Sequence, residues 1–224
     1  MPEQLSFDLP VRQALGREDF FVSPANAAPV ALIEGWQGWP GRKLLLIGPE
    51  GSGKTHLTHV WAALAQAQIL QAGDLPDADV PTLAQGSVAV ENADQIAGNP
   101  AAEEALFHLH NLVLAEGHSL LVTTARPANQ WGLDLPDLAS RMQGTPATTL
   151  AAPDDALLAA VVMKQMADRQ LSPSPDTIPF LIKRIDRSFA AARDIVARLD
   201  ALALARHAPI TRDLAKKLLD KSGG

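Results

Sequence analysis

The residues best suited to chemistry in this sequence form one continuous stretch. Residues 48–55 read Gly-Pro-Glu-Gly-Ser-Gly-Lys-Thr, which fits the phosphate-binding pattern G-x-x-x-x-G-K-[ST]. In such a loop, glycines let successive backbone N–H groups point at phosphate oxygens, the lysine reaches the β- and γ-phosphates, and the hydroxyl holds Mg²⁺. We therefore expect a nucleotide and its Mg²⁺ to bind here, through Gly48, Gly51, Ser52, Gly53, Lys54, Thr55 and His56. The alternative is a glycine-rich turn before a helix.

The segments around this motif are those that such a loop requires. The apolar run 43–48 predicts a buried strand, and the residues after Lys54 predict an amphipathic helix. Further strands are predicted at 69–70, 87–91 and 118–124, and a helix at 101–115 whose first turn is favoured by Glu103 and Glu104. This alternation of strands and helices predicts an α/β fold with a mostly parallel sheet.

The last third of the chain has a different pattern, in which helices follow one another. Residue 153 is a proline followed by two aspartates, a composition typical of a helix N-terminus. Further helices are predicted at 175–185, 188–206 and 211–221. We expect a tail over residues 1–15, an α/β core over 16–150 and a small all-helical domain over 151–224.

Two residues at the end of the predicted strand 87–91 bear on hydrolysis. A nucleotide hydrolase needs an acid at the end of a neighbouring strand to hold the magnesium ion and a base beside it. Glu91 would take the magnesium position, with Thr55, and Asn92 the position of the base. An amide cannot accept a proton at neutral pH, so we expect the chain's own hydrolysis to be weak or absent. Asp94 is a rival acid that would lie beyond the strand end.

The ordered set of motifs resembles the DnaA-like branch of the AAA+ ATPases, and within it the regulatory members. The resemblance covers residues 4 to 221 and is carried by the loop at 48–55 and by the segments SVAVENADQIAG, LLVTTARP and LPDLASRM. It implies an AAA+ P-loop core followed by a helical lid, and binding of ADP or ATP with Mg²⁺. It also implies a regulator that stimulates ATP hydrolysis by the replication initiator DnaA.

The resemblance assigns roles to further residues. Arg141, in LPDLASRM, matches the arginine finger that reaches a neighbouring subunit's γ-phosphate; the alternative is a surface arginine on a helix end. Thr123 or Thr124 would replace the sensor residue that relatives carry at the place of Ala125. Other positions matched to the nucleotide are Phe21, Val22 and Asn26 beside the adenine, with a core or hinge role as the alternative, and Arg193, one turn later than the relatives' sensor arginine. These departures imply a weakened catalytic site.

The N-terminal tail resembles a peptide that binds the sliding clamp, the beta subunit of DNA polymerase III. Its residues are Gln4, Leu5, Ser6, Phe7, Asp8 and Leu9. An extended peptide of this kind places its apolar side chains in a preformed groove, while the glutamine amide forms hydrogen bonds at the edge. The alternative is an edge strand or an apolar tail without a partner.

Composition limits the other classes of function. The 224 residues include 19 basic and 25 acidic ones, for a net charge of −6, which disfavours direct DNA binding. There is no cysteine, so disulfides, zinc–thiolate sites and cysteine nucleophiles are excluded. No apolar run approaches the roughly 20 residues that span a bilayer, and the first residues do not form a signal peptide. We expect a protein of the bacterial cytoplasm, associated with the replisome.

Two other classes of function remain open at this point. One is a self-sufficient ATPase that acts on DNA, in the manner of a helicase loader. The other is a clamp adaptor without catalytic function, in which Arg141 does no chemistry. The sequence also leaves open whether the chain forms a homodimer.

Overall fold

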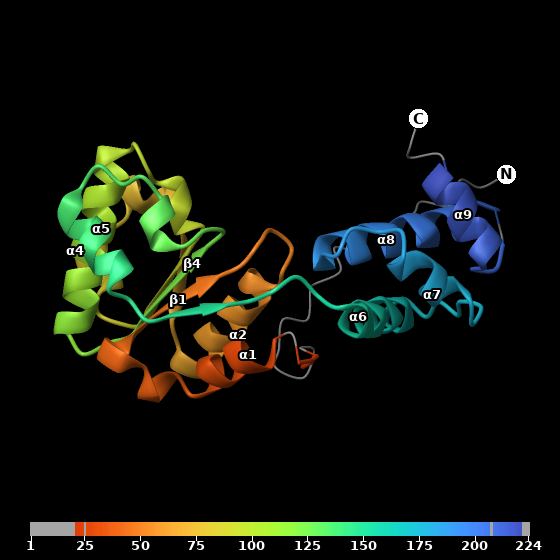
Figure 1. Ribbon diagram of the computed structural model, residues 1–224, viewed down its shortest axis with the longest axis horizontal. Coiled ribbons are helices and arrows are strands. Elements are labelled where there is room, and N and C mark those ends of the chain that lie inside the picture. Colours follow the sequence, from red (N-terminus) through yellow and green to blue (C-terminus); the bar gives the residue numbers. More distant parts are fainter. Residues whose placement is uncertain (1–20, 25, 207, 221–224) are drawn as a thin grey trace, which may run out of the picture.

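Five parallel strands form one sheet, in the order β2-β3-β4-β1-β5 (Figure 1). The computed structural model describes residues 21–24, 26–206 and 208–220. The strands are β1 (Lys43–Ile47), β2 (Gln68–Gln71), β3 (Val88–Glu91), β4 (Leu120–Thr124) and β5 (Ala147–Thr149). The expected parallel α/β fold is confirmed. Strand β5 was not predicted, because its three residues are Ala-Thr-Thr and form no apolar run.

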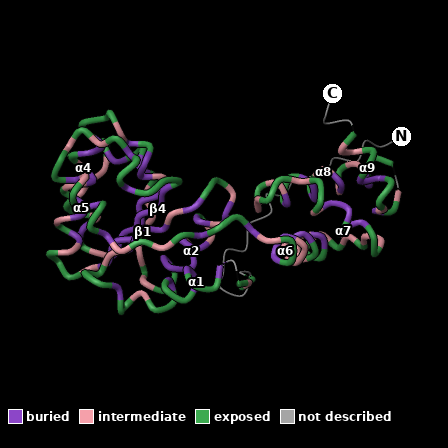
Figure 2. The backbone as a smooth tube through the Cα atoms, in the orientation of Figure 1, coloured by how far each residue is buried: buried purple, intermediate pink, exposed green. Residues whose placement is uncertain are grey.

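Helices cover both faces of this sheet. Leu44 and Leu46 pack with α1 (Ala27–Glu34) and α2 (Lys54–Ala65), whereas Leu45 packs with α4 (Pro100–Ala115) and α5 (Pro136–Gln143). Because successive side chains of a strand point to opposite faces, the continuous apolar run of β1 serves both layers. Figure 2 shows buried residues concentrated along the central strands.

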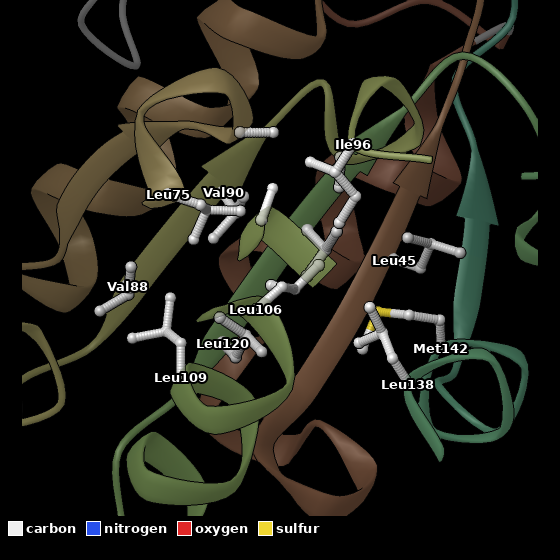
Figure 3. Close-up of a cluster of buried hydrophobic side chains, with 14 of the residues drawn as sticks. Leu45, Leu75, Val88, Val90, Ile96, Leu106, Leu109, Leu120, Leu138 and Met142 are labelled. Carbon is white, nitrogen blue, oxygen red and sulfur yellow. The ribbon is translucent and has the colours of Figure 1, made fainter. Parts of the chain in front are cut away.

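One apolar cluster joins α4 and α5 to the sheet (Figure 3). Leu138 and Met142 of α5 pack close to Leu45 of β1. Both are fully buried, so they fix one side of α5 against the sheet. The short elements between these helices and strands are α3 (Val80–Leu83) and the 3-10 helices η2 (Trp36–Gly38), η3 (Pro40–Arg42), η4 (Ala72–Asp77), η5 (Ala93–Gln95) and η6 (Ala128–Gln130).

The described residues after β5 form a helical bundle with an apolar core of its own. Its helices are α6 (Asp155–Asp168), α7 (Thr177–Ile182), α8 (Phe189–Arg206) and α9 (Arg212–Asp220), all within the predicted ranges. Asp154 caps α6 by accepting a hydrogen bond from the Leu157 N–H at 2.7 Å. The boundary expected at residues 151–153 falls between β5 and α6. Within the described ranges, no helix is long and apolar enough to cross a membrane.

A buried carboxylate connects α4 to the start of α5. Glu103 is only 1% exposed. Its Oε1 accepts from the Gly98 and Asp134 N–H groups at 3.1 and 3.3 Å, and its Oε2 accepts from the Leu135 N–H at 2.7 Å. Leu135 is the residue immediately before α5. Glu103 therefore does more than complement the dipole of its own helix, because it also fixes where α5 begins.

Glu103→Ala is expected to lower the free energy of unfolding by about 3 kcal/mol, since three backbone donors would lose their acceptor inside the protein. The measurement is urea unfolding at neutral pH. The matched control is Glu104→Ala, at an exposed neighbour on the same helix, which we expect to change stability by less than about 0.5 kcal/mol. Equal effects of the two substitutions would contradict the structural role of Glu103.

Candidate functional site

The predicted phosphate-binding loop lies between the carboxyl end of β1 and the N-terminus of α2. Gly51 and Gly53 have φ angles of +73° and +98°, in the left-handed region where residues with a Cβ are disfavoured. Gly53 is the cap residue of α2, so the loop runs directly into the first turn of that helix. The strand–loop–helix context that the motif requires is confirmed. Thr55 is exposed in the first turn of α2, and His56 is half-buried beside it.

Lys54 is buried at the base of the loop. Its Nζ donates hydrogen bonds to the carbonyl oxygens of Gly48 at 2.7 Å and Pro49 at 3.0 Å. Burial lowers the pKa of Lys54, and the negative charges of Asp94, Glu91 and Glu50 act in the opposite direction. The lysine therefore interacts electrostatically with both candidate acids, Glu91 at the end of β3 and Asp94 beyond it.

Glu91 and Asn92 are linked through a third side chain, Gln71, at the carboxyl ends of β2 and β3. Gln71 Nε2 donates to Glu91 Oε2 at 2.8 Å, and Asn92 Nδ2 donates to Gln71 Oε1 at 3.1 Å. The Asn92 N–H donates to Thr123 Oγ1 at 3.1 Å. Asn92 has a φ of +59°, a conformation that asparagine tolerates better than most residues. Gln71 therefore orients both residues that the sequence assigned to the magnesium position and the base.

Two buried oxygens at this end of the sheet indicate how a ligand would fit. Glu91 Oε1 and Ser52 Oγ are buried and have no hydrogen-bond partner among the described residues. A buried polar atom without a partner is costly unless a ligand or water satisfies it. A carboxylate oxygen and a loop hydroxyl are suitable contacts for Mg²⁺, its bound waters and phosphate. The residues present therefore fit a nucleotide with its metal ion.

The two threonines at the end of β4 make different contacts. The Thr123 hydroxyl accepts from Asn92 at the end of β3. The Thr124 hydroxyl, which was assigned to the nucleotide, donates to the Arg126 carbonyl at 2.8 Å and accepts from the Arg126 N–H at 3.1 Å. In this structure Thr123 is thus the residue connected to the predicted magnesium site, and Thr124 stabilises the turn after β4.

Asp94 also stabilises that turn. Its Oδ1 accepts from the Ala125 N–H at 3.2 Å, and its Oδ2 lies 3.4 Å from Arg126 Nε. The carboxylate is buried at 7% exposure, beyond the end of β3 as expected. Its oxygens therefore have protein partners, in contrast to Glu91 Oε1.

The first residues of α8 contact the loop, which the sequence did not predict. The Phe189 N–H donates to the Gly51 carbonyl at 2.9 Å. A Cβ placed on Gly51 would lie 2.5 Å from Ser188 Cβ, and one on Gly53 would lie 2.7 Å from Phe189 Cε2. Figure 1 shows the start of α8 beside this loop. Arg193 lies one turn further along α8 and is exposed.

The segment matched to the adenine lies immediately before α1. Asn26 is buried, and its side chain accepts from the Ser23 N–H and donates to the Phe21 carbonyl, both at 2.8 Å. Phe21 and Val22 lie at the surface, 38% and 50% exposed. Asn26 therefore fixes the backbone of this segment, and two apolar side chains remain accessible. The peptide from Gln4 to Leu9 lies outside the described residues.

Arg141 lies at the other end of the sheet from the loop. It is exposed in the last turn of α5, and its carbonyl accepts from Thr145 Oγ1 at 2.8 Å and from Lys43 Nζ at 3.5 Å. Lys43 is the first residue of β1, whereas the loop follows its last residue. At about 3.3 Å per residue, the strand separates the two ends by roughly 16 Å. Arg141 is therefore placed away from the loop of its own chain.

No protein-family model matches the sequence. Solved structures, however, share its fold. Domain III of the replication initiation protein DnaA from Thermotoga maritima superposes with a TM-score of 0.79 at 16% identity, over 95% of this chain and 98% of that domain. DnaA from Aquifex aeolicus with bound AMPPCP gives 0.68 at 16% identity, over 84% of this chain and 64% of that one. A RuvB variant from Thermotoga maritima gives 0.72 at 21% identity, over 93% and 73%. The chain therefore has the fold of AAA+ ATPases such as DnaA domain III and RuvB.

Proposed function

We propose that this chain is an Hda-like regulator of chromosomal replication initiation. It binds an adenine nucleotide, attaches to the sliding clamp of DNA polymerase III and stimulates hydrolysis of the ATP held by the initiator DnaA. The position of Arg141 carries this proposal: it is exposed, and β1 separates it from its own loop. An arginine so placed cannot reach the nucleotide of its own chain, but it is accessible to a nucleotide that another subunit holds. The similarity in fold to DnaA supports pairing with an initiator subunit.

In this proposal Arg141 supplies the charge that the initiator's own site needs during hydrolysis. Negative charge spreads over the oxygens of the transferred γ-phosphoryl group, and a guanidinium stabilises it without changing its protonation state. The guanidinium also donates hydrogen bonds in a fixed planar arrangement, which suits phosphate oxygens. The initiator provides the nucleotide, its metal ion and the attacking water, and the present chain provides the arginine.

The nucleotide bound by this chain acts mainly as a ligand that sets conformation. Lys54 and the loop amides would hold the phosphates of ADP or ATP, and Thr55 and Glu91 would hold Mg²⁺. Asn92, fixed by Gln71, cannot serve as a base. We also assign Arg193, Phe21 and Val22 to the surroundings of the nucleotide, whereas the Thr124 hydroxyl is engaged with Arg126.

The tail provides the connection to DNA. We assign clamp binding to Gln4–Leu9, through Leu5, Phe7 and Leu9 in an apolar groove and the Gln4 amide at its edge. The clamp encircles DNA, so a chain with a net charge of −6 needs no basic surface of its own to act there. The same partners place the protein in the bacterial cytoplasm, near the replisome.

Turnover of initiator-bound ATP, measured with and without clamp loaded on DNA, tests this function. The chain is expected to accelerate turnover only when the loaded clamp is present. Gln4→Ala combined with Phe7→Ala is expected to abolish co-elution with the clamp and to remove this acceleration, because the peptide loses its hydrogen-bonding amide and its aromatic anchor. Arg12→Ala, outside the peptide, is the matched control.

Three results would contradict parts of this proposal. Clamp binding retained by the doubly substituted tail would refute the tail assignment. DNA-stimulated ATP turnover by the chain alone would indicate a self-sufficient ATPase. Clamp binding without any effect on initiator-bound ATP would indicate an adaptor that has no catalytic role.

A further inference from the structure

A lysine and a histidine support the end of the helix that carries Arg141. Lys43 Nζ lies 3.1 Å from His110 Nε2 and 3.5 Å from the carbonyl oxygen of Arg141. Thr145 Oγ1 donates to the same carbonyl at 2.8 Å. These contacts join three elements that are distant in sequence: the start of β1, the middle of α4 and the last turn of α5.

The protonation state of His110 determines the direction of these hydrogen bonds. His110 Nδ1 lies 3.2 Å from Asn111 Oδ1, which can only accept, so Nδ1 carries the proton. Burial lowers the pKa of His110; the hydrogen bond with Asn111 opposes this, and the charges of Lys43 and Arg141 add to it. The ring is therefore neutral at physiological pH, and its Nε2 accepts a hydrogen bond from Lys43.

Lys43 contacts the C-terminal turn of α5, which is the end of a helix that a positive charge stabilises. The last carbonyl groups of a helix have no partner within it and carry partial negative charge. Lys43 reaches one of them from the sheet, while Leu138 and Met142 hold the buried side of the same helix (Figure 3). Burial lowers the pKa of Lys43, with the positive charge of Arg141 as a second cause. Partly burying an amine beside another cation is unfavourable, and the hydrogen bonds of Lys43 with His110 and the Arg141 carbonyl offset this cost.

We propose that Lys43, oriented by His110, is a positioning residue for Arg141, a role that rests on the function proposed above. It fixes the last turn of α5 relative to β1, so that the guanidinium meets the initiator's γ-phosphate without prior rearrangement. Such positioning lowers the activation barrier to ATP hydrolysis, because the guanidinium is already oriented before the reaction begins. Lys43 itself does not touch the phosphate.

Lys43→Met is expected to lower the maximal rate of initiator-bound ATP turnover by about tenfold. The concentration of the chain that gives half-maximal stimulation should not change, because the tail that binds the clamp is intact. Lys43→Arg should restore most of the rate, since it keeps a donor and a charge. Arg42→Met is the matched control: Arg42 is an adjacent cation whose Nη2 donates to the Leu114 carbonyl and not to α5.

The variants must first be compared with Arg141→Ala. If Arg141→Ala leaves turnover unchanged, the proposed function itself fails. If Arg141→Ala lowers turnover and Lys43→Met does not, only the positioning role fails. In the Arg141→Ala background, Lys43→Met should cause no further loss, because it acts through Arg141. A further loss would show that Lys43 acts independently.

Amide hydrogen exchange provides a second test that needs no initiator. The Gly144 and Thr145 N–H groups donate to Ser140 and Met142 at the end of α5. Lys43→Met should accelerate exchange at these two amides, whereas Arg42→Met should not. Unchanged protection in Lys43→Met would overturn the claim that Lys43 fixes this turn.

Discussion

Arg141→Ala is expected to reduce the stimulated turnover of initiator-bound ATP by about a thousandfold, the low end of the effects seen for arginine fingers supplied by a partner. The reason is that the transition state would lose its only contribution from this chain, while the contacts that bring the two proteins together remain. The measurement is the rate of ATP loss from the initiator in the presence of clamp loaded on DNA.

The position of Arg141 also predicts what this substitution leaves unchanged. Because Arg141 lies at the opposite end of β1 from the loop, affinity of the chain for ADP should not change. Arg42→Ala, at the same end of the sheet, is the matched control and should keep full stimulation, since its guanidinium contacts a carbonyl at the end of α4. Undiminished turnover with Arg141→Ala would exclude the finger and favour a clamp adaptor.

Lys54→Ala is expected to lower affinity for ADP by about a hundredfold. A hydrogen bond to a charged group contributes about 1.5–3 kcal/mol, and a loss of about 3 kcal/mol corresponds to a hundredfold change in Kd. Removing the ammonium also removes the positive charge that interacts with Asp94, Glu91 and Glu50 beside the loop. Isothermal titration calorimetry with ADP and Mg²⁺ measures the change directly.

A half-buried lysine at the other end of β1 provides a matched control for this variant. Lys43 lies at the amino end of β1 and Lys54 beyond its carboxyl end, so Lys43→Met should bind ADP as the unaltered protein does. Equal losses in the two variants would indicate a general effect on the fold. An unchanged affinity in Lys54→Ala would refute the loop as the nucleotide site.

The parts of the fold that could be predicted are those with local signals. The apolar run of β1 and the glycine pattern after it predicted a buried strand followed by a loop that runs into a helix, and these three elements are present. Strand β5 could not be predicted, because its three residues are held at the sheet edge only by pairing with β1. A short polar strand of this kind exists through its neighbours and not through its own sequence.

The sequence proposes the residues of the candidate site but does not reveal the contacts among them. Gln71 forms hydrogen bonds with both Glu91 and Asn92, yet nothing in its local sequence distinguishes it. Thr123 and Thr124 are adjacent, and only the pairing of β3 with β4 determines which one contacts Asn92. The contact of Phe189 with Gly51 joins residues far apart in sequence. Long-range packing determines such choices, and spacing within one segment does not reveal them.

The contact between the first residue of α8 and the loop means that a rotation of α8 about this contact would move its other end. Its 18 residues extend about 27 Å, with Phe189 at the end that rests on Gly51. A tilt of about 10° at this fulcrum would move the far end of α8 by about 5 Å. A small change in the loop would therefore be accompanied by a larger displacement at the far end of α8, which packs against α9. The surface that a partner meets around α9 would then depend on whether the loop at 48–55 is occupied.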